Sequence, residues 1–152
     1  MHRRKKTKMA ESVVLTSTQE DYLETIYHLV CQHNAARNKD IAEILQVKRA
    51  TVTGAVKQLV DKGLVKHKVH GVITLTEDGR KIAEKIIKSH RLFEEFFHTI
   101  LGLSEEEAGA IACQLEHIIT GTALDRFESL ISSIKGCNCQ AKFDPFGEQY
   151  GE

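Results

Sequence analysis

The chain has 152 residues, of which 41% are hydrophobic and 28% charged, and it contains one proline. This length allows one substantial core but excludes two large independent domains, and no apolar run approaches the ~20 residues of a membrane span. No apolar segment of the signal-peptide type follows the basic start, so we expect a cytoplasmic protein whose cysteines are thiols or metal ligands: Cys31, Cys113, Cys137 and Cys139.

The zero net charge conceals an uneven distribution. Residues 1–80 carry 14 lysines and arginines against 9 aspartates and glutamates, whereas residues 81–152 carry 7 against 12. A basic half suits contact with a polyanion, whereas an acidic half would be repelled by one. A nucleic-acid-binding surface is therefore expected in the first half of the chain.

Hydrophobic periodicity predicts a winged helix-turn-helix over residues 16–80, after a basic segment (residues 1–15) that we expect to be disordered. Ser17 with Glu20 would form the capping box of the first helix, and Asn38 would cap the second. The predicted helices cover residues 17–33, 38–45 and 49–62, and the predicted strands residues 64–69 and 72–75. The apolar residues expected to face inward include Tyr22, Leu23, Ile26, Ile41, Ile44, Leu45, Val52, Val56, Leu59 and Val60.

An all-helical domain is predicted over residues 81–136, followed by an irregular tail over residues 137–152. Thr76 would cap a long helix that reaches residue 101, and Ser104 with Glu107 would form a capping box for the next helix. A last helix is predicted over residues 123–135. Apolar residues at helical spacing, expected to face inward, include Ile86, Phe93, Phe97, Ala108, Ala112, Leu115, Ile118, Leu124, Phe127, Leu130 and Ile131. The fold class is therefore mostly α.

The third helix has the polar and basic residues that a DNA recognition helix needs at its N-terminal end. The lysines of the predicted wing would lie against a phosphate backbone or in a minor groove. The residues expected to contact DNA are Lys48, Arg49, Ala50, Thr51, Thr53 and Lys57 of the helix, and Lys66 and Lys68 of the wing. An ordinary solvated helix face is the alternative reading.

Three groups of candidate metal ligands recur at helical spacing, where residues three or four apart share a face. They are Asp21 with Glu24, His90 with Glu94, and Cys113 with Glu116 and His117. Singly, each group has another explanation, such as first-turn acids, a hydrogen-bonded core histidine or a small buried thiol. Their occurrence on three helices after a winged helix favours a transition-metal site.

Four segments together resemble the diphtheria-toxin-repressor / manganese-transport-regulator family, and the match runs from about Thr18 to Leu130: EDYLETIYHL, DIAEILQVKRATVTGAVKQLVDKGLV, ITLTEDGRKIAEKIIKSHRLFEEFF and LEHIITGTALDR. The resemblance implies metal-activated binding to operator DNA by a homodimer, with no membrane association and no organic cofactor. It implies a metal-ligand set of Asp21, Glu24, His90, Cys113, Glu116 and His117, with Glu94 as a further ligand.

The ligand types bear on the metal. An aspartate at the position of Asp21 is typical of manganese-responsive members, whereas a cysteine at the position of Cys113 is typical of iron-responsive members. Because thiolate favours later ions and manganese is the weakest binder of the divalent series, the prediction is iron(II), with manganese(II) as the alternative. Gly109 replaces a histidine of the iron-responsive members, so a complete second site with His90 and Glu94 does not follow from the resemblance.

Two other functions compete with a metal-dependent repressor. A winged-helix regulator could sense an oxidant or an organic ligand, with Cys137 and Cys139 as a redox pair. A metalloenzyme could use the same histidine, glutamate and cysteine cluster. An enzyme is disfavoured because every candidate general base is already assigned as a ligand and no nucleophile motif is present.

Overall fold

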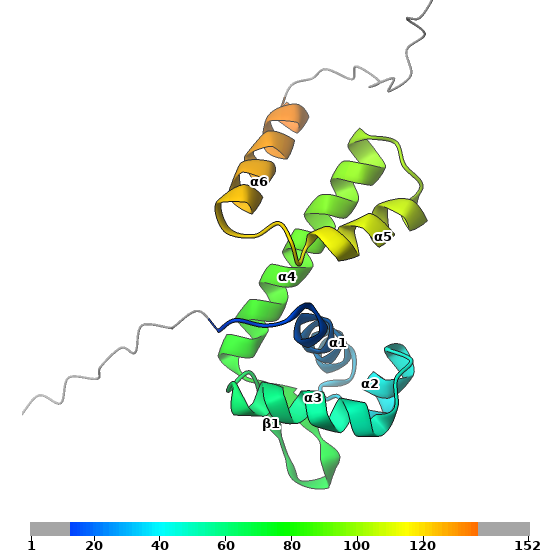
Figure 1. The fold of residues 1–152 in the computed structure, drawn as a ribbon, viewed down its shortest axis with the longest axis vertical. Helices are drawn as coiled ribbons and strands as arrows, with labels where there is room; N and C mark the ends of the chain where they lie inside the picture. Colours follow the sequence, from blue (N-terminus) through cyan, green and yellow to red (C-terminus); the bar gives the residue numbers. More distant parts are fainter. Residues whose placement is uncertain (1–12, 137–152) are drawn as a thin grey trace, which may run out of the picture. The chain divides into compact units, whose positions relative to one another are not determined.

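The computed structural model of the protein describes residues 13–136, which are mostly helical, as expected (Figure 1). They divide into two compact units, one ending at Arg80 and the other beginning at Lys81. Within residues 13–136, no helix combines the length and apolar character needed to cross a membrane. The predictions for the basic start of the chain and for the tail with Cys137 and Cys139 concern residues outside the described range.

The N-terminal unit has the element order of a winged helix-turn-helix, which confirms the predicted fold. It consists of α1 (Ser17–His33), α2 (Asn38–Ile44), α3 (Arg49–Asp61), β1 (Val65–His67), the 3₁₀ turn η1 (Val69–Gly71) and β2 (Ile73–Leu75). The two strands pair antiparallel, with Val65 opposite Leu75. A β-bridge between Ala36 and Ile73 joins this ribbon to the connection between α1 and α2. The wing is therefore anchored to the helices at its base.

Two of the predicted helix caps are wrong. The capping box of α1 is formed by Thr16 and Gln19, with the Gln19 amide donating to Thr16 Oγ1 over 3.3 Å, and not by Ser17 and Glu20. Residues 16–18 all carry hydroxyl groups, so the sequence does not distinguish neighbouring starts. Asn38 does not cap α2 but is its first helical residue, and Arg37, in the cap position, makes no side-chain cap hydrogen bond.

The core of the N-terminal unit joins all three helices to the ribbon. Its fully buried side chains include Leu23, Ile26, Ile41, Val52, Leu59, Leu64 and Ile73. Two residues predicted to face inward are instead exposed, Ile44 at 55% and Val60 at 36%. Helix α2 has only seven residues, and Ile41 and Ala42 are its buried ones. Ile44 is the last residue of this helix, one turn beyond Ile41.

The first turn of α4 (Glu77–Glu95) lies directly on the backbone that precedes the wing. A Cβ built on Gly79 would lie 2.0 Å from the carbonyl oxygen of Leu64. The Gly79 amide donates to Thr76 Oγ1 over 3.0 Å, as expected for the predicted cap, and the Thr76 amide donates to Leu64 O over 2.9 Å. Only glycine permits this approach, because any side chain would overlap the Leu64 peptide.

The C-terminal unit contains the rest of α4, the π-helical segment η2 (Phe96–Ile100), α5 (Glu105–Leu115) and α6 (Gly121–Gly136). The predicted capping box of α5 is confirmed, because the Glu107 amide donates to Ser104 Oγ and the Ser104 amide donates to Glu107 Oε2. The Ser104 hydroxyl donates to Glu107 Oε2 over 2.6 Å, and this bond, together with the one from the Ser104 amide, holds the pKa of the Glu107 carboxyl below its usual value. The predicted helix to residue 101 is wrong in one respect, since its last turn is a π turn.

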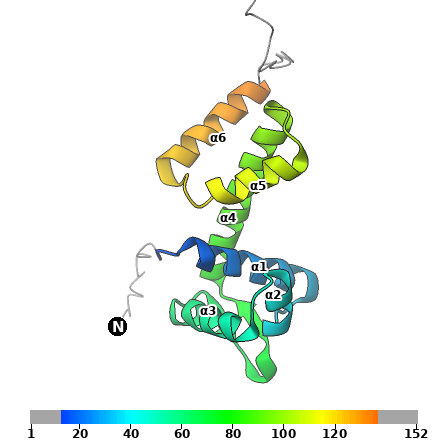
Figure 2. The ribbon, with the colours of Figure 1, turned by 45° about the vertical axis from the view of Figure 1, so that its right-hand side comes forward.

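Helices α5 and α6 pack beside the C-terminal part of α4 through an aromatic core (Figure 2). Phe93 is fully buried, and its ring centroid lies 5.0 Å from that of Phe127, which in turn lies 4.9 Å from that of Phe96. Two predicted inward residues, Ile118 and Leu130, are 73% and 51% exposed. Ile118 lies in the turn after α5, where the helical periodicity that placed it inward no longer applies. On α6, by contrast, the neighbouring Ile131 is the buried residue.

Candidate metal centre and nucleic-acid interface

Four of the predicted metal ligands meet within the C-terminal unit. His90 lies on α4, Cys113 lies on α5, and Glu116 and His117 follow α5 directly. His90 Nδ1 is 2.7 Å from Glu116 Oε2 and 3.8 Å from Cys113 Sγ. His117 Nε2 is 3.5 Å from Glu116 Oε1. The Glu116 carboxylate therefore lies between two imidazole rings, with the thiol next to His90.

The backbone at the end of α5 determines which side chains face His90. The Glu116 amide still donates to Ala112 O over 3.0 Å, and Glu116 keeps helical dihedral angles (φ −59°, ψ −28°). The helical course therefore continues one residue beyond Leu115. Residues three apart on a helix share a face, so Cys113 and Glu116 both face His90.

Burial differs sharply among these side chains. The Glu116 side chain is 2% exposed, His117 15% and His90 21%, whereas Cys113 is exposed. A buried carboxylate loses its hydration and needs charged or hydrogen-bonding partners in compensation. The two imidazoles supply that compensation, and the thiol forms the solvent-exposed side of the cluster.

The donor atoms suit a divalent transition metal. Imidazole nitrogen and thiolate sulfur favour such ions over magnesium or calcium, which prefer oxygen ligands alone. The buried Glu116 carboxylate adds the negative charge that a cation requires. The residues present in the C-terminal unit therefore fit the predicted metal in charge and ligand chemistry.

The other three predicted ligands lie on α1 and α4. Asp21 and Glu24 lie one turn apart on α1, in the N-terminal unit, and Glu24 Oε1 is 3.6 Å from His28 Nε2. On α4, the Glu94 carboxylate faces α5, where a Cβ built on Gly109 would lie 3.9 Å from Glu94 Oε1. Glu94 is thus next to Gly109, the position where a histidine is expected from the resemblance to the iron-responsive members.

The predicted DNA-contacting residues lie on α3, on the residue before it and on the wing of the N-terminal unit. On α3, Val52, Val56 and Leu59 are buried against the core. The eight predicted residues are all exposed: Lys48, Arg49, Ala50, Thr51, Thr53, Lys57, Lys66 and Lys68. We call these eight residues the basic face. A basic, exposed helix followed by a basic ribbon has the chemistry that phosphate and base-edge contacts require.

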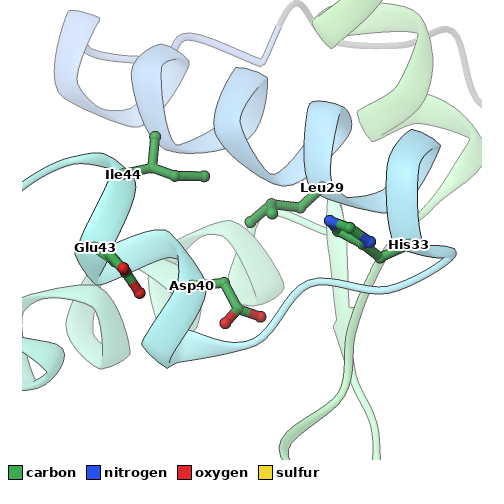
Figure 3. A pocket seen from close by; sticks show the side chains of 5 residues that line it. All are labelled: Leu29, His33, Asp40, Glu43 and Ile44. Carbon is green, nitrogen blue, oxygen red and sulfur yellow. The ribbon is translucent and has the colours of Figure 1, made fainter.

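A hollow of about 490 Å³ lies between α1 and α2 (Figure 3). Leu29 and Ile44 contribute apolar surface, and His33 on α1 and Asp40 on α2 contribute polar side chains. Glu43 completes the lining. None of the predicted ligand or DNA-contacting residues lines this hollow, so it belongs to neither site.

Comparisons with known proteins agree with this division of the chain. Residues 14–72 match the family model for the iron dependent repressor N-terminal DNA binding domain. Residues 76–143 match the model for the iron dependent repressor metal binding and dimerisation domain. The two parts of the sequence therefore match the two domains of iron dependent repressors.

Curated relatives cover most of the chain. The HTH-type transcriptional regulator MntR of Geobacillus kaustophilus is 38% identical over 117 residues, which span 76% of this chain and 82% of the relative. An uncharacterised HTH-type transcriptional regulator of Methanocaldococcus jannaschii is 35% identical over 117 residues, spanning 76% of this chain and 94% of the relative. Both are described as transcriptional regulators, in line with the expectation of a non-enzymatic protein.

Solved structures show the same fold. The IdeR structure from T. acidophilum matches 78% of this chain with a TM-score of 0.68 and 27% identity, and the manganese regulator SloR matches 78% with a TM-score of 0.68 and 30% identity. The chain covers 56% and 55% of those two structures, a little over half of their length. The structure of a manganese-dependent transcriptional repressor in complex with manganese matches 75% of this chain, with a TM-score of 0.66 and 30% identity. The match covers 52% of that structure's own chain. The chain belongs to the iron-dependent repressor family of metal-dependent transcriptional regulators.

Proposed function

We propose that this protein represses transcription as a homodimer that binds operator DNA when a divalent metal ion, preferably iron(II), occupies the C-terminal unit. The observation that carries the proposal is the cluster of His90, Cys113, Glu116 and His117, because its donor atoms converge on one buried carboxylate. Family membership supplies the coupling between metal and DNA. The protein would act in the cytoplasm, where operator DNA is found.

The ligand assignment is part of this proposal. His90, Glu116 and His117 would bind through imidazole nitrogen and carboxylate oxygen, and Cys113 through its thiolate. The family resemblance adds Asp21, Glu24 and Glu94 to the ligand set, and these three stay predictions. When bound, the ion supplies positive charge that offsets the carboxylates and favours one conformation of the protein. Because metal binds that conformation more tightly, it shifts the population towards the DNA-binding state.

The preference for iron(II) over manganese(II) rests on Cys113. Solved relatives show that this fold accepts several ions, since structures of the repressor ScaR hold Zn²⁺ and Cd²⁺ and another relative holds manganese. Thiolate binds later, softer ions better than manganese. An exposed thiol next to His90 therefore favours iron(II) in this chain.

Anaerobic titration tests the function directly. Apo-protein is titrated with iron(II), manganese(II) or zinc(II) while the fluorescence anisotropy of a labelled duplex from its own promoter region is followed. We expect tight binding that needs metal and that a chelator reverses, with iron(II) effective at the lowest free concentration. Equal DNA binding with and without every metal would contradict the co-repressor role.

A serine substitution tests the metal preference. Cys113→Ser should weaken iron(II) more than manganese(II), because it removes the only sulfur atom of the proposed ligand set. Cys31→Ser is the matched control, because Cys31 is likewise an exposed cysteine but lies on α1. If both variants keep the wild-type order of metals, Cys113 does not set the preference.

A further inference from the structure

Asn38 connects α2 to α3 through a side-chain hydrogen bond. Its amide Nδ2 donates to Thr53 Oγ1 over 3.0 Å. The Thr53 hydroxyl in turn donates to the carbonyl oxygen of Arg49 over 3.0 Å. This chain of hydrogen bonds, here called the Asn38 relay, runs from the start of α2 to the first turn of α3. It ends among residues of the basic face.

The relay determines what the Thr53 hydroxyl can offer to a ligand. A hydroxyl group has one proton and two lone pairs. The proton is donated to Arg49 O and one lone pair accepts from Asn38, so one lone pair remains, together with the Thr53 methyl group. Phosphate oxygens only accept hydrogen bonds, so Thr53 cannot donate to a phosphate while the relay is intact.

The base edges in the major groove match the two groups that Thr53 still has available, one lone pair and a methyl group. The amino groups of adenine and cytosine donate hydrogen bonds there, and thymine presents a methyl group. A remaining lone pair can accept from either amino group, and the threonine methyl can contact the thymine methyl. Thr53 is exposed on α3, next to the glycine at position 54, whose Cβ position is open within 4 Å.

The orientation of the Asn38 amide is fixed by the same hydrogen bonds. Asn38 Oδ1 is buried and accepts no hydrogen bond from residues 13–136. Rotating the amide by a half turn would bury the NH₂ group at that point. It would also draw the Thr53 proton to Asn38 and break the hydrogen bond from the Thr53 hydroxyl to Arg49 O. Two hydrogen bonds thus favour the orientation seen.

We propose that Asn38 is a positioning residue for sequence recognition, acting through Thr53, and that Thr53 reads base edges instead of phosphates. The proposal rests on the proposed role of the basic face in binding DNA. Asn38 itself lies on α2, outside the set of residues expected to contact DNA. Its effect on binding would therefore depend entirely on the presence of the Thr53 hydroxyl.

A double-mutant cycle tests this dependence. Asn38→Ala, Thr53→Val and the double variant are compared with wild type for binding to the promoter duplex at saturating manganese(II). Each single variant should lose about five-fold in affinity, the effect of one neutral hydrogen bond. The double variant should lose no more than the Thr53→Val variant alone. Thermal unfolding in parallel shows whether each variant is folded.

Two further readouts separate positioning from a structural role. Affinity for non-specific duplex and the slope of log affinity against log salt should stay at wild-type values, because phosphate contacts set both. In a Thr53→Ser background, which keeps the hydroxyl, Asn38→Ala should again cost about five-fold. Additive losses in the cycle, or a reduced salt slope for Thr53→Val, would overturn the proposal. Failure of the wild-type protein to bind the promoter duplex would overturn the basic face as well.

Discussion

Burial, more than distance, should decide how much each of two hydrogen-bonded side-chain pairs in the C-terminal unit contributes to stability. His90–Glu116 and Lys88–Glu128 both have a separation of 2.7 Å. Their side chains are 21% and 2% exposed in the first pair but 69% and 43% exposed in the second. An exposed pair contributes about 0–1 kcal/mol because water screens it. Removing one partner of a buried, charged hydrogen bond costs about 2–4 kcal/mol.

Alanine at each glutamate measures the difference. In metal-free protein, Glu116→Ala should lower Tm by about 6–12 °C, at roughly 3 °C per kcal/mol for a chain of this size. Glu128→Ala should lower it by no more than about 3 °C. Differential scanning fluorimetry with a chelator present gives both values. Equal shifts for the two variants would refute the argument from burial.

The same two variants then separate stability from metal binding. Metal at a hundred-fold excess over its Kd stabilises the folded state by about 2.7 kcal/mol, or about 8 °C here. Wild type and Glu128→Ala should show this increase on addition of manganese(II), and Glu116→Ala should not. An undiminished increase in Glu116→Ala would remove Glu116 from the ligand set.

Three other substitutions have defined outcomes. Gly79→Ala places a Cβ against the Leu64 peptide and should cost more than about 3 kcal/mol by urea unfolding, whereas a stable variant would show that α4 can move there. Because Ser104 lowers the pKa of Glu107, the ionised carboxyl stabilises the fold at neutral pH, and this stabilisation is lost as pH falls through the lowered pKa. Glu107→Gln should therefore have a lower Tm than wild type at pH 7 but not in strong acid, and a pH-independent difference would contradict this. Lys57→Ala should reduce the salt slope of DNA binding by about one and weaken all duplexes alike, and a loss confined to specific DNA would contradict a phosphate contact.

The order of helices and strands could be predicted from the sequence because the capping and turn residues agreed with the hydrophobic periodicity. Ser104 and Glu107 marked the start of α5 correctly, and the residues His70 and Gly71 marked the turn of the wing, where both have positive φ. The grouping of Cys113, Glu116 and His117 also followed from helical spacing. These features depend on residues no more than four positions apart.

Features that depend on packing between distant segments could not be predicted. The contact of His90 with Glu116 joins residues 26 positions apart, and spacing cannot show which face of α4 meets α5. Asn38 is of a residue type that often caps helices, but in the structure its side chain donates a hydrogen bond to Thr53, 15 positions further along the chain. The exposure of Ile118 likewise depends on where α5 ends.

The π turn at η2 has a consequence for how the chain tolerates changes in length. Such a turn holds one residue more than an α turn, and its hydrogen bonds join residues five apart. Loss of one residue from Phe96–Ile100 would convert the turn to regular α-helix and keep the following segment in place. The same loss from α4 between His90 and Phe93 would instead rotate His90 by about 100° relative to the aromatic core and away from Glu116. Single-residue deletions should therefore be better tolerated within η2 than in the part of α4 that precedes it.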